Sequence, residues 1–240
     1  MATGRPDPLR RLDATIEAVR GLRQILATEE RLDDVLARIA VTATHAVAGA
    51  DAVTVTVLAN GKPRTAAWTD EDMVDVDVRQ YTADRGPCLL AARTRRPVRA
   101  ALGEQAARWP EFTGAAERRG VRAYLSVPLI ADDLVASLNT YTRTAAPFDP
   151  FDEGLLCLYA TAAAQAITTA LRSQRTVSQL ALALTSRAEI DQAKGVLMAL
   201  HGCTADDAFV TLVTESQRTN VKLNQVARAL LDSVRARRTE

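Results

Sequence analysis

The sequence predicts an α+β domain, an antiparallel sheet flanked by helices, that continues into one long helix and a small helical bundle. Three observations lead to this fold class. Short β-type stretches near Val53 and Leu134 alternate with helical stretches, residues 152–200 keep a helical period throughout, and short amphipathic segments end the chain. The strands are too few and too unevenly spaced for a barrel or a sandwich, which favours a sheet covered by helices.

The composition is that of a globular protein. The 240 residues are 48% hydrophobic and 25% charged, and the net charge of +1 comes from interspersed signs without a basic tail. Residues 1–13 contain proline and charges with no apolar run behind them, so we expect no secretion signal, no membrane span and a cytoplasmic protein. Cys88, Cys157 and Cys203 are scattered, which argues against a disulfide framework and against a zinc site.

The first part of the chain changes from a helical to a strand period. Residues 9–48 predict one long helix, or two with a break near residues 28–30. After Gly49, valines alternate with threonines, and the Asn60-Gly61 pair that follows predicts a hairpin whose second strand covers residues 64–69. Further strands are predicted at residues 97–99, 125–130 and 134–142, and helices at residues 88–93 and 105–120.

The long helix carries a seam of apolar residues at the three-four spacing of a coiled coil. Up to residue 171 this face either packs on the sheet of its own domain or pairs with a second helix, and the pattern does not distinguish the two. Beyond residue 171 no sheet remains to cover it, which favours a coiled-coil stem between two copies and therefore a homodimer. The seam consists of Leu156, Tyr159, Ala163, Ala166, Ala170, Val177, Leu180 and Leu184.

The last segment predicts a three-helix bundle. His201-Gly202 ends the first helix, because glycine readily adopts the left-handed conformation that closes a helix. Thr204 and Asp207 have the spacing of a capping box at the start of the second helix. A third helix carries apolar residues from Leu223 onward at helical spacing. So small a bundle cannot enclose a catalytic cleft, and its function must lie on its surface.

Exposed polar residues on this bundle suit contacts with a polyanion. Arg187 and Lys194 lie seven residues apart, two helical turns or about 10 Å along one face, which allows them to contact separate phosphates. Gly195 interrupts the helical pattern at a cost of roughly 1 kcal/mol relative to alanine. It indicates close approach either of a neighbouring helix or of a nucleic-acid backbone.

The run Gln192-Ala193-Lys194-Gly195-Val196-Leu197-Met198, followed by His201-Gly202-Cys203-Thr204 and Asp207-Ala208-Phe209, resembles the ANTAR domain of antiterminators over residues 177–234. The resemblance implies a module on a coiled-coil stem that binds paired hairpin loops in nascent transcripts and, as a dimer, disrupts an intrinsic terminator. Ala193, Phe209 and Leu223 are expected in its core. The implied RNA-binding residues are Arg187, Gln192, Lys194, Gly195 and Met198 on the first helix, with Arg218, Asn220 and Lys222 at the junction of the others.

The preceding part resembles a GAF domain through Ala50-Asp51-Ala52-Val53, Asp84-Arg85-Gly86-Pro87-Cys88 and Ser126-Val127-Pro128-Leu129. This resemblance implies a small antiparallel sheet, flanking helices that dimerise and a pocket for an unidentified small ligand. We therefore divide the chain into an N-terminal helical segment at residues 1–21, a GAF sensor domain at residues 22–171 and an ANTAR domain with its stem at residues 172–236.

Phe148 and the Asp152-Glu153 pair resemble part of the cyclic-nucleotide signature of GAF domains, but Thr142-Arg143 stands where that signature has Asn-Lys. The two carboxylates also suit the first turn of the long helix, where negative charge is favoured. The second interpretation is preferred over a role in ligand binding.

No catalytic motif is present, and we expect neither an enzyme nor a bound cofactor or metal. Cys88 is either a buried, inert thiol, which we prefer, or a redox or bilin site. Two other functions remain open for the bundle. Three helices with a glycine-containing turn also occur in DNA-binding regulators, and the bundle would equally serve as a protein-docking module beside a ligand-sensing GAF domain.

Overall fold

The computed structural model describes residues 7–25, 31–144 and 148–237, and it forms two compact units, Met1–Gln174 and Arg175–Glu240. The break predicted at residues 28–30 lies outside the described residues. The first unit contains α1 (Pro8–Ile25), α2 (Leu32–Ala46), β1 (Ala52–Ala59), β2 (Lys62–Trp68), α3 (Asp72–Thr82), α4 (Pro87–Thr94), β3 (Val98–Ala101), the 3₁₀ helix η1 (Leu102–Gln105), α5 (Pro110–Arg118), β4 (Ala123–Ala131) and β5 (Leu134–Thr142). Helix α6 (Pro150–His201) then continues into the second unit, which adds α7 (Ala205–Thr219) and α8 (Leu223–Arg237).

A five-stranded antiparallel sheet in the order β2-β1-β5-β4-β3 forms the centre of the first unit. Asn60 and Gly61 connect β1 to β2 with φ angles of 51° and 75°, the two left-handed residues of a type I′ turn. Ala59 pairs with Lys62 directly across this turn. The predicted hairpin and the α+β fold class are therefore confirmed.

Helix α3 has no counterpart in the sequence prediction. Its sequence, DMVDVDVRQYT, alternates aspartate with β-branched valine, a pattern with low helix propensity. Met73 and Val76 are nevertheless buried in one cluster with Phe112 of α5 and Tyr141 of β5. Burial of these side chains stabilises the helix more than the local propensity opposes it.

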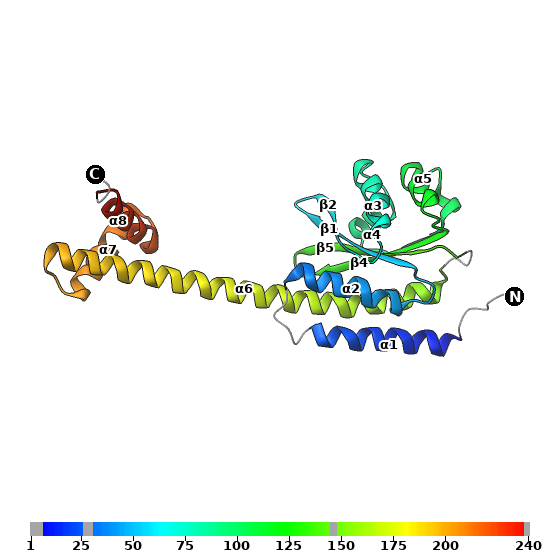
Figure 1. The fold of residues 1–240 in the computed structure, drawn as a ribbon, viewed down its shortest axis with the longest axis horizontal. Coiled ribbons are helices and arrows are strands. Elements are labelled where there is room, and N and C mark those ends of the chain that lie inside the picture. The colour runs from blue at the N-terminus through cyan, green and yellow to red at the C-terminus, as the bar shows by residue number, and fades with distance from the viewer. Residues whose placement is uncertain (1–6, 26–30, 145–147, 238–240) are drawn as a thin grey trace. The chain divides into compact units, whose positions relative to one another are not determined.

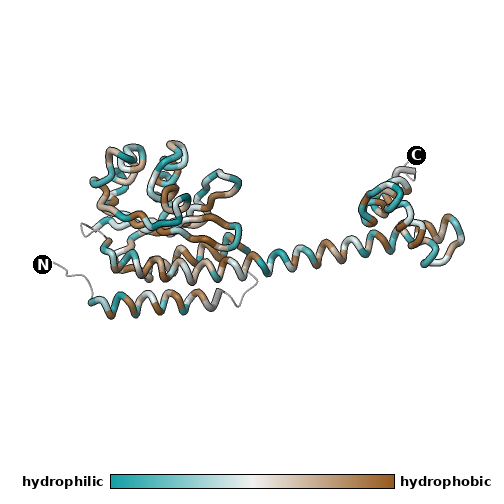
Figure 2. Tube along the Cα trace, turned by 180° about the vertical axis from the view of Figure 1, so that it is seen from behind, coloured by the Kyte–Doolittle hydropathy of each residue, from teal (hydrophilic) through white to brown (hydrophobic). Residues whose placement is uncertain are grey.

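Helix α2 and the first half of α6 cover one face of the sheet, whereas α3, α4 and α5 lie on the other face (Figure 1). Leu36 and Ile39 of α2 are fully buried together with Leu156, Tyr159 and Ala163 of α6. In Figure 2 hydrophobic positions are concentrated in the strands and recur along α6. The first half of the predicted seam therefore packs in its own domain, and the coiled-coil interpretation is wrong for these residues.

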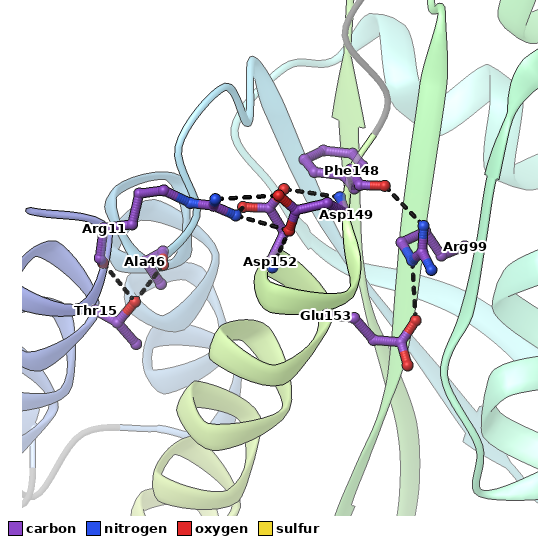
Figure 3. Close-up of polar contacts among 8 residues, drawn as sticks. All are labelled: Arg11, Thr15, Ala46, Arg99, Phe148, Asp149, Asp152 and Glu153. Carbon is purple, nitrogen blue, oxygen red and sulfur yellow. Dashed lines mark hydrogen bonds and ion pairs between the residues drawn. The ribbon is translucent and has the colours of Figure 1, made fainter. Parts of the chain in front are cut away.

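Helix α1 is attached to the start of α6 by a buried arginine (Figure 3). Arg11, of which only 6% is exposed, donates from Nη1 and Nη2 to the two carboxylate oxygens of Asp149 at 3.1 and 2.8 Å, and Nη2 also contacts Asp152. Asp152 accepts the backbone N–H of Asp149 at 2.9 Å and Asp149 accepts that of Asp152 at 2.8 Å, in the manner of a capping box. Thr15 donates to the carbonyl oxygen of Ala46 at 2.6 Å.

A second arginine holds the same helix start from the sheet. Arg99 of β3 donates from Nε to Glu153 at 3.0 Å and from Nη1 to the carbonyl oxygen of Phe148 at 2.8 Å (Figure 3). Asp152 and Glu153 both lie in the first turn of α6 and both bind arginines of the chain itself. These contacts support the helix-start interpretation of the two carboxylates over a role in ligand binding.

We predict that Arg11→Ala destabilises the folded protein by about 3 kcal/mol, because it leaves the buried carboxylate of Asp152 without its guanidinium. Denaturant unfolding of the full chain measures this loss. The matched control is Arg20→Ala on the same helix, whose arginine is 67% exposed and pairs only with Glu17 among the described contacts. Equal stability of the two variants would show that the Arg11 contacts contribute nothing.

Candidate nucleic-acid interface and sensor interior

The second unit is a helical bundle, and its helices begin and end at residues that the sequence predicts. Gly202, with a φ of 64°, ends α6. Thr204 accepts the backbone N–H of Asp207 and the carboxylate of Asp207 accepts the backbone N–H of Thr204, both at 3.2 Å, which completes the capping box at the start of α7. The core of the bundle is formed by the buried residues Ala193, Leu197, Ala208, Leu212 and Ala227.

Polar contacts attach α8 to α6. Asn224 donates to the hydroxyl oxygen of Ser186 at 3.2 Å, and Arg228 donates to Glu189 at 2.8 and 2.5 Å. Asn220, one of the predicted RNA-binding residues, ends α7 in the left-handed conformation with a φ of 54°. The backbone of Asn220 therefore has a structural role as a helix cap.

Four residues of α6 form a stripe along one side of the helix, which we call the cation stripe: Arg187, Asp191, Lys194 and Met198. They are spaced four, three and four residues apart, so they follow one another along one face. Arg187 Nε lies 3.9 Å and Lys194 Nζ lies 3.6 Å from the carboxylate of Asp191. Both cations thus share one counterion, which a bound phosphate would have to replace.

The two cations differ in exposure. The side chain of Arg187 is 84% exposed, but that of Lys194 is only 24% exposed, and its Nζ lies 5.9 Å from the centroid of the Phe209 ring. Phe209 is itself 41% exposed. The prediction that Phe209 belongs to the core is therefore wrong: it follows the buried Ala208, and a step of about 100° around the helix places it at the rim.

The remaining predicted residues of α6, Gly195 and Gln192, lie three residues apart, with Gly195 next to the cation stripe and Gln192 farther around the helix. Gly195 is exposed, and a Cβ atom placed on it would meet no atom of the described residues within 4 Å. No neighbouring helix explains this glycine, so its backbone is open to an external molecule. Gln192 is exposed but precedes Lys194 by two residues, about 200° around the helix.

Arg218 and Lys222 lie at the junction of α7 and α8. Arg218 donates from Nε and Nη2 to Glu215 at 2.8 and 2.7 Å, and the carbonyl oxygen of Lys222 accepts the N–H groups that begin α8. In the part of the chain that the structure describes, no polar contact joins either residue to the cation stripe. Arg187, Lys194 and Met198 are thus brought together, with Gly195 beside them, while the other predicted residues lie elsewhere.

The face of the sheet that α3, α4 and α5 cover contains a buried carboxylate that the sequence analysis missed. Asp77 of α3 accepts hydrogen bonds from the hydroxyls of Tyr141 at 2.7 Å and Thr65 at 3.1 Å, and from the Gln80 amide at 3.3 Å. Burial raises the pKa of Asp77 from 3.8 to about 6, although the hydrogen bonds from Tyr141 and Thr65 partly oppose the shift.

The Asp84–Cys88 motif packs against the same interior. The side-chain oxygen of Gln80 accepts the backbone N–H of Cys88 at 3.0 Å, and a Cβ atom on Gly86 would lie only 2.2 Å from that oxygen, so glycine is required there. Cys88 is fully buried, and desolvation together with the nearby Asp77 raises the pKa of its thiol well above the usual value. The interpretation of Cys88 as a buried, inert thiol is supported.

A surface pocket of about 300 Å³ opens beside this motif, at the start of α4. Two of its arginines are paired, Arg85 with Glu111 and Arg93 with Asp84. The Arg108 guanidinium lies 4.7 Å from the centroid of the Trp109 ring. The pocket is lined by Asp84, Arg85, Gly86, Leu89, Leu90, Arg93, Arg108 and Trp109.

Comparisons with family models identify both units. A GAF domain model matches residues 29–168, and an ANTAR domain model matches residues 178–231. The chain belongs to the GAF family, and its last part contains an ANTAR domain. No match was found among curated proteins. The ANTAR match of this GAF–ANTAR protein contains the whole cation stripe and most of the bundle.

Two solved structures illustrate the GAF fold. The GAF domain from a phosphoenolpyruvate-protein phosphotransferase of Coxiella burnetii is 17% identical with a TM-score of 0.51, and the match covers 68% of this chain and 98% of that one. A free methionine-R-sulfoxide reductase from Neisseria meningitidis, in complex with its substrate, is 16% identical with a TM-score of 0.53, covering 71% and 96%. At these identities the likeness shows the fold alone.

Helix α6 of the GAF–ANTAR protein is long and apolar enough to cross a membrane by length and composition. Leu156, Tyr159 and Ala163 of this helix are nevertheless buried against the sheet, as in the core helix of a soluble protein. GAF and ANTAR domains are typically soluble, and the burial of these residues agrees with that.

We predict that Asp77→Asn removes a pH dependence of stability. Since the pKa of Asp77 is raised on folding, its protonated form stabilises the fold below about pH 4, and that stabilisation is lost as the pH rises to about 6. The free energy of unfolding of the natural protein, relative to the Asn variant, should fall by about 3 kcal/mol across this window. Denaturant unfolding at several pH values measures it, with Asp75→Asn as the control. A difference that does not change with pH contradicts the prediction.

Proposed function

We propose that this protein is an RNA-binding transcription antitermination regulator whose ANTAR bundle binds hairpin loops in nascent transcripts. The observation that carries the proposal is the cation stripe inside the ANTAR match, with Arg187 exposed and the Gly195 backbone open beside it. Proteins that recognise unpaired loop bases rely on stacking and on hydrogen bonds to base edges. The net charge of +1 is therefore compatible with RNA binding.

We infer a homodimer in the cytoplasm. Val177, Leu180 and Leu184, which continue the apolar seam of α6 beyond the sheet, are 53%, 60% and 60% exposed. An exposed apolar stripe of this spacing suits a coiled coil with a second copy. Two bundles joined in this way would bind two hairpins of one transcript with a gain in effective concentration.

For the GAF domain we propose that a small ligand, or a relayed signal, changes the state of the regulator. The pocket beside α4 is the candidate ligand site, and Arg108 in its lining, which lies against Trp109, is available to an anionic group of a ligand. Native mass spectrometry of the purified protein would detect a retained ligand.

We propose further that the protein has no catalytic activity. The pKa of the Cys88 thiol is raised by burial, and so is that of Cys157, which disfavours the thiolate on which cysteine chemistry depends. The reductase likeness concerns the fold and does not bear on this proposal.

We predict that the protein binds tandem hairpin RNA more tightly than scrambled RNA at physiological salt, and that Arg187→Ala weakens this binding several-fold. Loss of one phosphate contact should also lower the slope of log K against log salt by about 1. Because Lys194 packs against Phe209, Lys194→Met, which keeps an apolar stem, tests its charge better than alanine. The control is Lys62→Ala, an exposed lysine of β2 in the GAF domain. Absence of any preference for hairpins would reject the proposed function.

We predict that Leu180→Asp with Leu184→Asp separates the dimer, because it places charges in the apolar seam. The matched control is Leu182→Asp, since Leu182 is 69% exposed but lies on the opposite side of α6. Native mass spectrometry reports the number of subunits. A dimer that survives the double substitution would exclude this seam as the interface.

A further inference from the structure

Phe209 occupies an unexpected place in the bundle. It is the single Phe, Tyr or Trp between residues 175 and 240. A large aromatic side chain would ordinarily be placed in the core, yet the buried residues around it include the small Ala193 and Ala208, and the Phe209 ring is 41% exposed. The one flat apolar surface of this unit is therefore presented at its rim.

One side chain of the cation stripe, Lys194, lies beside the ring. Lys194 Nζ lies 5.9 Å from the ring centroid, at the outer limit of about 6 Å for a cation–π contact, so the ammonium is readily displaced from the ring. Met198, which is 38% exposed, follows Lys194 by four residues and extends the same side of α6. The ring thus lies beside one cation of the stripe, and the thioether of Met198 and the second cation, Arg187, continue the same side of α6.

We propose that Phe209 is the stacking platform for one unpaired nucleobase of the bound hairpin loop. This inference rests on the proposed RNA-binding function and adds to it a site for a base. The base would replace the Lys194 ammonium over the ring, and the ammonium would move from Asp191 and the ring to a flanking phosphate. Both groups keep a partner in this exchange, and stacking on an aromatic ring accepts any base because every base has a π-face.

The test uses the full-length chain and a hairpin RNA in which 2-aminopurine replaces one loop base at a time. Stacking on Phe209 should change the fluorescence of the probe at one loop position. We expect Phe209→Leu, which retains an apolar side chain but no ring, to abolish that change and to weaken binding about tenfold. Phe209→Tyr should retain both the fluorescence change and the affinity.

Thermal unfolding and native mass spectrometry of the same variants separate stacking from other roles of the ring. A weaker affinity of Phe209→Leu is assigned to lost stacking when this variant keeps the subunit number and the unfolding midpoint of the natural protein. Loss of subunit pairing in this variant would assign the ring to a protein contact and overturn the proposal. Unchanged affinity with an unchanged fluorescence response would overturn it as well.

Two outcomes remain decisive if Phe209→Leu does not fold. The natural protein must still produce a fluorescence change at one position, and Phe209→Tyr must preserve it; a natural protein that binds hairpins without any such change overturns the stacking platform. A natural protein that fails to bind hairpin RNA rejects the proposed function instead, so the two failures are distinguishable.

Discussion

The contact of the buried Arg11 with Asp149 and Asp152 is the constraint that holds α1 against the start of α6 in the first unit. Taking these charges out of water is unfavourable unless each is paired and hydrogen-bonded. The two aspartates satisfy this condition by capping the first turn of α6 and accepting the Arg11 guanidinium at the same time. Arg99 adds a link from the sheet to the same turn. Three elements from distant parts of the sequence therefore meet at the start of α6. On the same helix Leu156, Tyr159 and Ala163 are then buried in the core of the first unit.

The cation stripe must bind phosphate groups of RNA without attracting every polyanion. A free pair of cations seven residues apart would attract any polyanion, whereas Asp191 between Arg187 and Lys194 supplies an internal counterion. Surface ion pairs of this kind are individually weak, so a phosphate competes with Asp191 at little cost. The arrangement suits a protein that recognises RNA by its loop bases, because weak nonspecific attraction leaves the choice of partner to contacts with the bases.

The interior of the GAF domain combines apolar packing with a buried polar network around Asp77. Tyr141, Thr65 and Gln80 supply the hydrogen bonds that the buried carboxylate needs, and Gln80 also holds the backbone of the Asp84–Cys88 motif through Cys88. The Asp84–Cys88 motif, which resembles that of GAF domains, is thus attached to the sheet through α3. Any ligand in the pocket beside α4 would contact a loop whose conformation depends on this network.

Features that local interactions control could be predicted from the sequence. The Asn60-Gly61 turn, the capping box of Thr204 and Asp207, and the end of α6 at Gly202 each depend on residues a few positions apart, and the structure confirms them. Which face of a helix is covered by other elements could be known only from the tertiary structure. It assigned the first half of the α6 seam to the sheet, made α3 a helix in spite of its valines, and placed Phe209 at the rim beside Lys194. The physical reason is that burial depends on neighbours distant in sequence, which periodicity within one segment does not specify.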